Sequence, residues 1–172
     1  MSQNIFLASD LHLSHSNIIT FLDDEGNRIR PFNSIAEHDE ILTQNWNRVV
    51  RPSDKVYVLG DVAFKNAHLE PLARMNGTKV LIKGNHDELK PSQYLNYFKD
   101  IRACSILDKF ILTHIPIHPD SLSRWKANIH GHLHQNVVKL PDGSPDPRYI
   151  NVSMEQISFT PIPFESIRSR FK

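Results

Sequence analysis

Five short motifs along the chain carry side chains that can bind divalent cations or transfer a proton. They supply seven potential metal ligands: Asp10, His12, Asp61, Asn85, His114, His132 and His134. Carboxylate, imidazole and amide groups suit Mn, Fe or Zn, and they do not form a thiolate-type zinc site. Seven ligands exceed the need of one ion, but two ions roughly 3.5–4 Å apart that share one carboxylate would use them all. Such a pair lowers the pKa of a bound water and holds the oxygens of an in-line displacement at phosphorus, so the set indicates metal-assisted chemistry on phosphate esters.

The most informative motif is the turn Gly84-Asn85-His86-Asp87, which follows the apolar run 80–82. A short apolar run that meets Gly-Asn is typical of a buried strand entering a tight turn. The turn presents an amide, an imidazole and a carboxylate, and histidine exchanges protons near neutral pH. Taken alone, this tetrapeptide fits a solvated surface turn as well as a metal-binding site, and Asp10-x-His12 taken alone fits a solvated turn better. The presence of all five motifs together favours a metal-binding site.

The elements that must position these motifs alternate between strands and helices. Short apolar runs predict strands at 5–9, 55–59, 80–82, 105–107, 110–113 and 149–152, and a run ending in Ile129 leads to the last motif. Helices are predicted at 35–50, 69–75, 94–98 and 164–171, the first with a capping box at Ser34–Glu37 and a stop at Pro52. This alternation is typical of a layered α/β fold, in which sites gather at the carboxyl ends of the strands.

The composition predicts one globular domain over residues 1–172, with 40% hydrophobic and 23% charged residues. A net charge of +1 provides no global field that would attract nucleic acid or an anionic membrane. The single cysteine, Cys104, excludes an internal disulfide framework and fits a reducing compartment. No apolar run reaches 18 residues, and residues 1–4 lack the basic start of a signal peptide, so we expect a cytoplasmic protein without a membrane span.

Taken in order, the motifs resemble those of the calcineurin-like metallophosphoesterase superfamily: Asp-x-His, Gly-Asp, Gly-Asn-His-Asp, a strand-end His and Gly-His-x-His, between residues 10 and 134. The run 9–18, with Arg-Pro-Phe and Asn-Trp-Asn further on, is similar to a group of small bacterial and phage phosphoesterases. The resemblance implies a four-layer α/β/β/α sandwich with a dimetal site at the strand ends. It also implies hydrolysis of a phosphomonoester or phosphodiester by a metal-bridging hydroxide, without a covalent intermediate.

The resemblance also implies a role for each residue. One metal would be held by Asp10, His12, Asp61 and His134, and the other by Asp61, Asn85, His114 and His132. Asp61 would therefore bridge the two metals. His86 would donate a proton to the leaving oxygen or stabilise charge there, and Asp87 would orient its turn. The cofactors expected are two divalent ions, with manganese first and iron, zinc or nickel as alternatives.

Three further residues are candidates for binding the substrate. Arg30 lies in the polar loop 23–33 beside Pro31, and its guanidinium could hold a phosphate oxygen with two hydrogen bonds; a solvated loop arginine is the alternative. His15 either contacts substrate or makes a structural hydrogen bond, and Asn17 is the next candidate. We expect His130 to be structural, and His38, His68 and His118 to lie on the surface.

The expected substrate is a small, nucleotide-like phosphoester, and the oligomeric state is left open. The run Gly60-Asp61-Val62-Ala63-Phe64 departs from the pattern of protein Ser/Thr phosphatases, and it leaves a carboxylate partner for His86 unidentified. A nuclease is one alternative, but it would need a basic groove with aromatic residues, and the net charge does not suggest one. A non-catalytic metal-binding scaffold is another, although no ligand position is lost.

Overall fold

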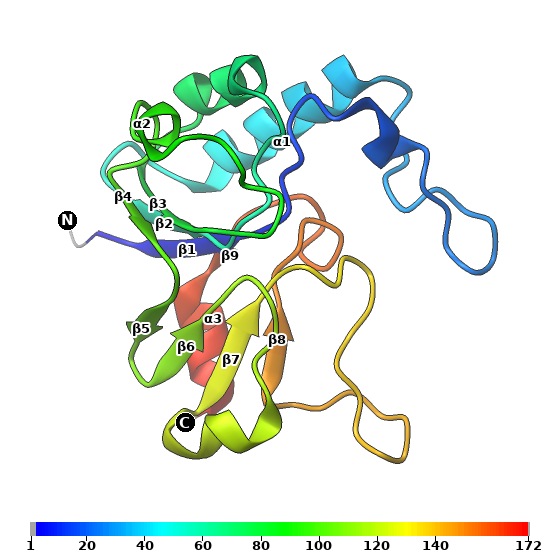
Figure 1. The fold of residues 1–172 in the computed structure, drawn as a ribbon, viewed down its shortest axis with the longest axis vertical. Helices are drawn as coiled ribbons and strands as arrows, with labels where there is room; N and C mark the ends of the chain where they lie inside the picture. Colours follow the sequence, from blue (N-terminus) through cyan, green and yellow to red (C-terminus); the bar gives the residue numbers. More distant parts are fainter. Residues whose placement is uncertain (1–2, 172) are drawn as a thin grey trace.

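The computed structural model describes residues 3–171 as two β-sheets with helical segments around them (Figure 1). The expectation that the chain has no signal peptide was based on residues 1–4. Two of these, Met1 and Ser2, lie outside the residues that the structure describes. The first sheet has the order β4-β3-β2-β1-β9, and the second has the order β5-β6-β7-β8. The strands of the first are β1 Ile5–Ala8, β2 Lys55–Val58, β3 Thr78–Ile82, β4 Asp100–Arg102 and β9 Ile162–Pro163. Those of the second are β5 Ser105–Leu107, β6 Phe110–Leu112, β7 Ala127–His130 and β8 Tyr149–Asn151.

Helical segments cover the outer face of the first sheet (Figure 1). They are α1 Ile35–Val49, the 3-10 helix η2 Asn66–Arg74 and the short α2 Pro91–Tyr94. The hydroxyl of Ser34 accepts the backbone N–H of Glu37 at 3.1 Å, which confirms the predicted N-cap of α1. Trp46 of α1 is only 1% exposed and packs into the apolar cluster beneath the helices, as expected for a core residue. Among residues 3–171, no helix has both the length and the apolar character needed to cross a bilayer.

The second apolar cluster fills the space between the two sheets. Successive side chains of a strand point to opposite faces, so Leu7 faces the second sheet while Phe6 and Ala8 face the helices. Phe164 of α3 Phe164–Arg168, which continues into the 3-10 helix η4 Ser169–Phe171, joins the same cluster. The inner strands are therefore buried on both faces, which explains their nearly continuous apolar sequences.

On the outer face of the second sheet packs the segment around Ile117, which follows β6 and continues into η3 Pro119–Arg124. Asn128 of β7 is fully buried on this face, where its Oδ1 accepts the N–H of Ile117 at 3.0 Å. The hydroxyl of Tyr149 donates to the carbonyl of Ile117 at 2.7 Å. The predicted four-layer α/β class is thus confirmed, and on this face the loop around Ile117 covers the sheet.

Two of the predicted helices need correction. The helix expected at 69–75 is the 3-10 helix η2, which contains Pro71, and proline cannot donate the backbone hydrogen bond of an α-helix interior. The helix expected at 94–98 lies earlier, at Pro91–Tyr94, because proline suits the first helical position. Four short elements were not predicted: the 3-10 helices η1 Ser16–Ile19 and η3 Pro119–Arg124 and the strands β4 and β9.

The register of the parallel strands brings the motifs to one edge. Ala8 of β1 pairs with Val58 of β2, which pairs with Leu81 of β3, so the turns after these strands lie side by side. Leu112 of β6 pairs with Ile129 of β7 in the second sheet. A bridge between Ser9 and Ser153 joins the chain that follows β1 to the chain that follows β8. The carboxyl ends of both sheets therefore meet.

Candidate metal centre

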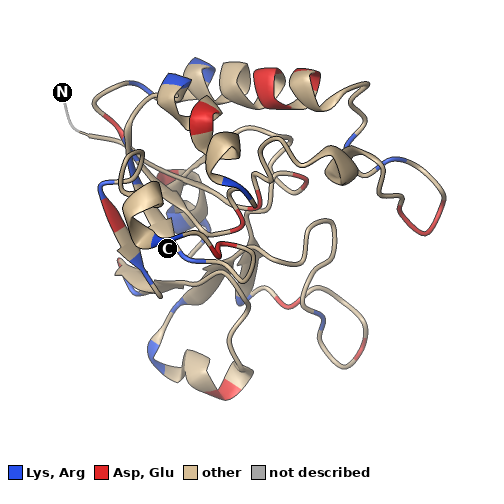
Figure 2. Ribbon diagram, turned by 45° about the horizontal axis from the view of Figure 1, so that its top comes forward, with Lys and Arg blue, Asp and Glu red and all other residues tan. Residues whose placement is uncertain are grey.

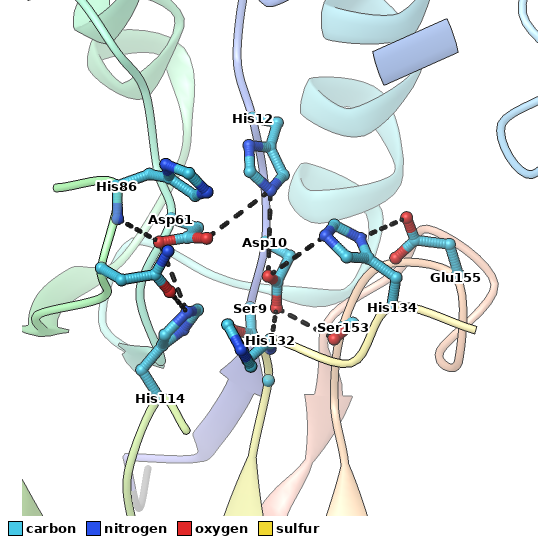
Figure 3. A network of polar contacts seen from close by, with 12 residues as sticks. Ser9, Asp10, His12, Asp61, His86, His114, His132, His134, Ser153 and Glu155 are labelled. Atoms are coloured by element: carbon cyan, nitrogen blue, oxygen red, sulfur yellow. Dashed lines mark hydrogen bonds and ion pairs between the residues drawn. The ribbon is translucent and has the colours of Figure 1, made fainter. Parts of the chain in front are cut away.

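The first group of potential ligands consists of Asp10, His12 and His134, whose ligand atoms all lie within 4.8 Å of one another (Figure 3). Nε2 of His12 and Nε2 of His134 each lie 3.8 Å from Oδ1 of Asp10. Asp10 and His12 are buried, and His134 is partly exposed. Two residues that follow β1 and one that follows β7 are thus brought together as the sequence predicts.

The second group consists of Asp61, His114 and His132, within the same limit of 4.8 Å. Nε2 of His114 lies 3.4 Å from Oδ1 of Asp61 and 2.9 Å from Oδ1 of Asn85, so Asn85 joins this group. Nδ1 of His114 lies 2.6 Å from the carbonyl of Leu59, which can only accept a hydrogen bond. The proton of His114 is therefore on Nδ1, and Nε2 faces the other ligands.

Asp61 is the residue that faces both groups. Its Oδ2 lies 3.8 Å from Nε2 of His12, while its Oδ1 faces His114 and accepts the backbone N–H of His86 at 3.0 Å. Burial alone would raise the pKa of Asp61, but His114, the N–H of His86 and the nearby His12 lower that pKa to about 2. Asp61 is therefore an ionised carboxylate between two sets of imidazoles.

The first group contains buried polar atoms that need a cation. Within residues 3–171, Oδ1 of Asp10 and both ring nitrogens of His12 have no hydrogen-bond partner. A buried polar atom without a partner costs about 1–3 kcal/mol. Burial, followed by the charge of Arg30, holds the pKa of His12 well below its usual value, so the ring is neutral and can bind a metal. These donors fit a divalent cation.

The backbone at the centre is strained and tightly packed. Residues in the left-handed region include Asp10 (φ 58°), His12 (φ 48°), Asp61 (φ 53°), His132 (φ 69°) and His134 (φ 51°). Such residues cost of order 1–3 kcal/mol each and concentrate at functional sites. Gly131 is required here, because a Cβ at this position would clash with Oγ of Ser9 and Oδ2 of Asp10. The two sheets approach each other too closely at this point for any side chain.

Asp87 orients the turns, as expected, and takes no part in either group. Its carboxylate accepts the N–H groups of Gly84, Asp61 and Val62 at 2.8, 2.9 and 3.0 Å. The turn after β3 is thereby fastened to the turn after β2. This contact fixes the position of Asn85 and His86 relative to Asp61.

His86 lies at the mouth of the centre and is exposed. Its ring centroid lies 4.9 Å from that of Phe64 and 6.1 Å from that of His12. Among residues 3–171, no side-chain carboxylate contacts the His86 ring. The ring packs against Phe64 instead, so His86 has no carboxylate partner of the kind that the sequence analysis left unidentified. His15 lies beside it, with its ring 4.5 Å from Phe64, and burial followed by the charge of His86 lowers the pKa of His15.

The expectation that Arg30 binds substrate is wrong. The residue is fully buried, and its guanidinium is directed away from solvent. Nε donates to Oε1 of Glu155 at 2.8 Å, and the two terminal nitrogens donate to the carbonyls of Leu11 and Asp10 at 3.1 and 2.6 Å. Arg30 therefore supports the strained turn that carries Asp10 and His12.

Two of the histidines expected on the surface are also placed differently. His38 is fully buried, where its ring contacts Arg30 at 2.9 Å and Asp39 at 2.8 Å. His68 is half-buried. His118 is exposed and His130 is buried, as predicted. Asn17 is exposed in η1, and its hydrogen bonds within the described chain are those that its carbonyl accepts from Thr20, so the structure does not bring it to either group.

Sequence reasoning missed Glu155 and Ser153. Oε1 of Glu155 accepts from Arg30 and contacts Nδ1 of His134 at 3.0 Å (Figure 3). Burial alone would raise the pKa of Glu155, but His134 and Arg30 lower that pKa to about 2. The hydroxyl of Ser153 donates to Oδ2 of Asp10 at 2.9 Å. Both follow β8 in a polar stretch that matches no motif, so no local signal could have identified them.

Comparisons with known proteins place the chain among relatives of similar length. No protein-family model matches it. The uncharacterised protein MJ1445 of Methanocaldococcus jannaschii is 35% identical over 175 residues, which cover 96% of this chain and 89% of that protein. The Gene 66 protein of Mycobacterium phage D29 is 25% identical over 186 residues, which cover 88% of each chain.

A solved structure has the same fold. The Aquifex aeolicus protein of unknown function AQ665 matches with a TM-score of 0.73 and 23% identity, over 98% of this chain and 100% of that one. The match to a phage protein agrees with the expectation that the chain has phage relatives. With 35% identity over almost its whole length, the chain belongs to the family of MJ1445.

Proposed function

We propose that this chain is a metal-dependent hydrolase of a small phosphomonoester or phosphodiester. The observation that carries the proposal is the position of Asp61, whose two carboxylate oxygens face the two ligand groups at 3.8 and 3.4 Å. Ligand groups that share one carboxylate suit a pair of divalent cations. Manganese is the favoured metal, with iron, zinc or nickel as alternatives, because the donors are carboxylate, amide oxygen and imidazole.

In this proposal Asp10, His12, Asp61 and His134 would hold the first cation. Asp61, Asn85, His114 and His132 would hold the second. When bound, the cations would lower the pKa of water and neutralise charge on the phosphoryl oxygens.

The residues behind the ligands set which ring nitrogen faces each cation. The carboxylate of Glu155 is ionised, so the contact with Nδ1 of His134 requires a proton on that nitrogen. The carbonyl of Leu59 likewise requires a proton on Nδ1 of His114. Both histidines therefore present Nε2, with the other ring nitrogen held by a hydrogen bond, as is usual for metal-binding histidines.

His86 is the proposed proton donor to the leaving oxygen. Its backbone is held by Asp61 and its ring packs against Phe64, so the imidazole lies beside both ligand groups while remaining exposed. In that position it can deliver a proton, or stabilise developing charge, on an oxygen that departs toward solvent.

The experiment that tests the proposal removes and restores the metal. Chelator-treated protein should be inactive on 4-nitrophenyl phosphate and bis(4-nitrophenyl) phosphate, and Mn²⁺ should restore turnover of at least one of them. Asp61→Ala should lose both metals, measured by elemental analysis, because the two ligand groups would then lack their shared anion. Asp120→Ala, at an exposed residue of η3, is the control and should retain both metals.

Two results would contradict the proposal. Two tightly held metals in Asp61→Ala would remove the bridging role. Bound metal without turnover on any ester would instead favour a metal-binding scaffold.

A further inference from the structure

A pocket of about 410 Å³ adjoins the two ligand groups on the side of His132 and His134. Its volume lies within the roughly 300–1,000 Å³ range of small-molecule sites. Ile18, Phe21, Leu22, Ile29 and Leu133 form an apolar wall, and His132 and His134 form the edge toward the ligand groups. A phosphoester whose phosphorus lies at the ligand groups would therefore direct one of its substituents into this pocket.

The apolar wall is exposed but held in place. Phe21 and Leu22 are 48% and 56% exposed, although burial is the ordinary state of such side chains. They belong to loop 21–29, which projects from the body of the molecule beside η1 (Figure 1). The loop closes on itself through the hydrogen bond from the N–H of Ile29 to the carbonyl of Phe21 at 3.0 Å and the bridge between Leu22 and Arg28. The wall is thus a preformed surface of the kind that contacts a flat apolar group.

The rest of the pocket lining is polar and includes Gln135, Asn136 and Glu155. The side-chain amides of Gln135 and Asn136 make no hydrogen bond to any residue between 3 and 171. The pocket lining includes no lysine or arginine. The tip of loop 21–29 carries three consecutive acidic residues, Asp23–Glu25 (Figure 2). These features suit an uncharged ring with a hydrogen-bonding edge and oppose a second phosphate or a nucleic-acid strand.

We infer that this pocket binds the organic group of the substrate, and that this group is a planar ring with a polar edge, as in the base of a mononucleotide. The inference rests on the proposed function, since it takes the ligand groups as the place of the phosphorus. The ring lies against Phe21 and Leu22, and its polar edge bonds to Gln135 or Asn136.

Equilibrium binding tests this inference without turnover. Thymidine 5′-phosphate, phenyl phosphate and ethyl phosphate carry the same phosphate group. Calorimetry with the manganese-loaded protein compares the affinities of their phosphonate analogues, in which a CH₂ group replaces the ester oxygen so that no hydrolysis occurs; each analogue is named by its parent ester. The thymidine ester should bind at least about tenfold more tightly than the ethyl ester, with the phenyl ester between them. Phe21→Ala should weaken the two ring ligands by roughly 5- to 100-fold and leave ethyl phosphate unchanged. Gln135→Ala should weaken only the thymidine ester.

The matched control is Ile106→Ala, at a 57% exposed apolar residue of β5 that lies outside the pocket lining; all three affinities should stay unchanged. Equal affinities for the three ligands would overturn the inference. So would tighter binding of a single-stranded oligonucleotide that falls steeply with added salt, because that behaviour reports contacts with several phosphates. Preference for ring ligands without hydrolysis of any ester would support the ring-binding pocket and contradict the proposed function. Hydrolysis without preference for ring ligands would support the proposed function and contradict the ring-binding pocket.

Discussion

Nε of Arg30 donates to Oε1 of Glu155 at 2.8 Å, across 125 residues of sequence, and neither side chain is more than 5% exposed. The pair fastens the turn after β1 to the segment after β8. Arg30 also holds the carbonyls of Asp10 and Leu11, while Glu155 holds the ring of His134. The buried pair therefore positions ligands of the first group from behind, without facing the substrate.

The Arg30–Glu155 pair should show strong coupling in folding stability. Arg30→Met leaves a buried carboxylate unpaired and Glu155→Gln leaves a buried guanidinium unpaired, so each should lower the free energy of unfolding by about 3–5 kcal/mol. The double variant should lose clearly less than the sum. Urea denaturation of the four metal-free proteins measures this, and additive losses would show that the two residues act independently.

Arg30→Lys separates positioning from substrate binding. A lysine point charge cannot serve Glu155 and two carbonyls at once, so kcat should fall. The loss should be equal on monoesters and diesters, because Arg30 does not reach the substrate. A larger loss on monoesters, which carry the extra charge, would restore the substrate role that the structure contradicts.

The same network predicts a pH dependence for the metal-free protein. The pKa of Glu155 falls from its ordinary 4.5 to about 2, so its stabilisation is complete above about pH 4.5 and is lost as pH falls toward 2. Burial lowers the pKa of His134, but the contact with Glu155 raises that pKa above its ordinary 6.5. The stabilisation that His134 gains from this contact is therefore complete below pH 6.5 and is lost at higher pH. The stability gap between the wild type and Glu155→Gln should thus be largest between about pH 4.5 and 6.5, with roughly 3 kcal/mol from the Glu155 shift. A gap that is constant from pH 3 to 8 would contradict it.

The sequence predicts the motif residues well and the residues behind them poorly. Asp10, Asp61 and Asn85 follow apolar runs, and parallel strands necessarily align their carboxyl ends. The contact between Arg30 and Glu155 exists only when the two sheets close on each other, and neither residue carries a periodic or motif signal. Sequence proximity therefore suggests an exposed loop arginine where folding produces a buried one.

Asp87→Asn should weaken the centre without touching a ligand. The carboxylate accepts three backbone N–H groups, and an amide nitrogen in place of one oxygen leaves at least one of them unpaired. We expect a loss of about 1–3 kcal/mol in unfolding free energy and reduced retention of manganese during dialysis. Tyr94→Phe, which removes the 3.4 Å hydrogen bond from the Tyr94 hydroxyl to Asp87 but keeps the carboxylate and its three backbone donors, is the matched control and should retain its metal. Equal metal content in both variants would contradict the orienting role.

Gly131→Ala should destabilise the protein by about 3 kcal/mol or more, since the new Cβ would meet Ser9 and Asp10, and Oγ of Ser9 is itself held by Leu59 at 2.7 Å. Gly26→Ala provides the comparison, because Gly26 has φ +83° but nothing within 4 Å of a Cβ. That substitution should cost only about 1 kcal/mol, from backbone strain. Thermal unfolding of both variants checks the difference, and similar melting temperatures would show that the sheets can separate at this point.

The last prediction concerns the proton donor. His86→Asn removes the ring but keeps the backbone N–H that Asp61 accepts, so metal content should stay unchanged. A general acid contributes roughly 10²–10⁴-fold to rate, so kcat should fall by about that factor on alkyl esters. The loss should be much smaller on 4-nitrophenyl esters, because nitrophenolate departs without a proton. Phe64→Leu should give a weaker form of the same pattern, since it releases the ring from its packing surface while leaving the imidazole in place. If His86→Asn slows good and poor leaving groups equally, then His86 stabilises charge at the departing oxygen without transferring a proton to it.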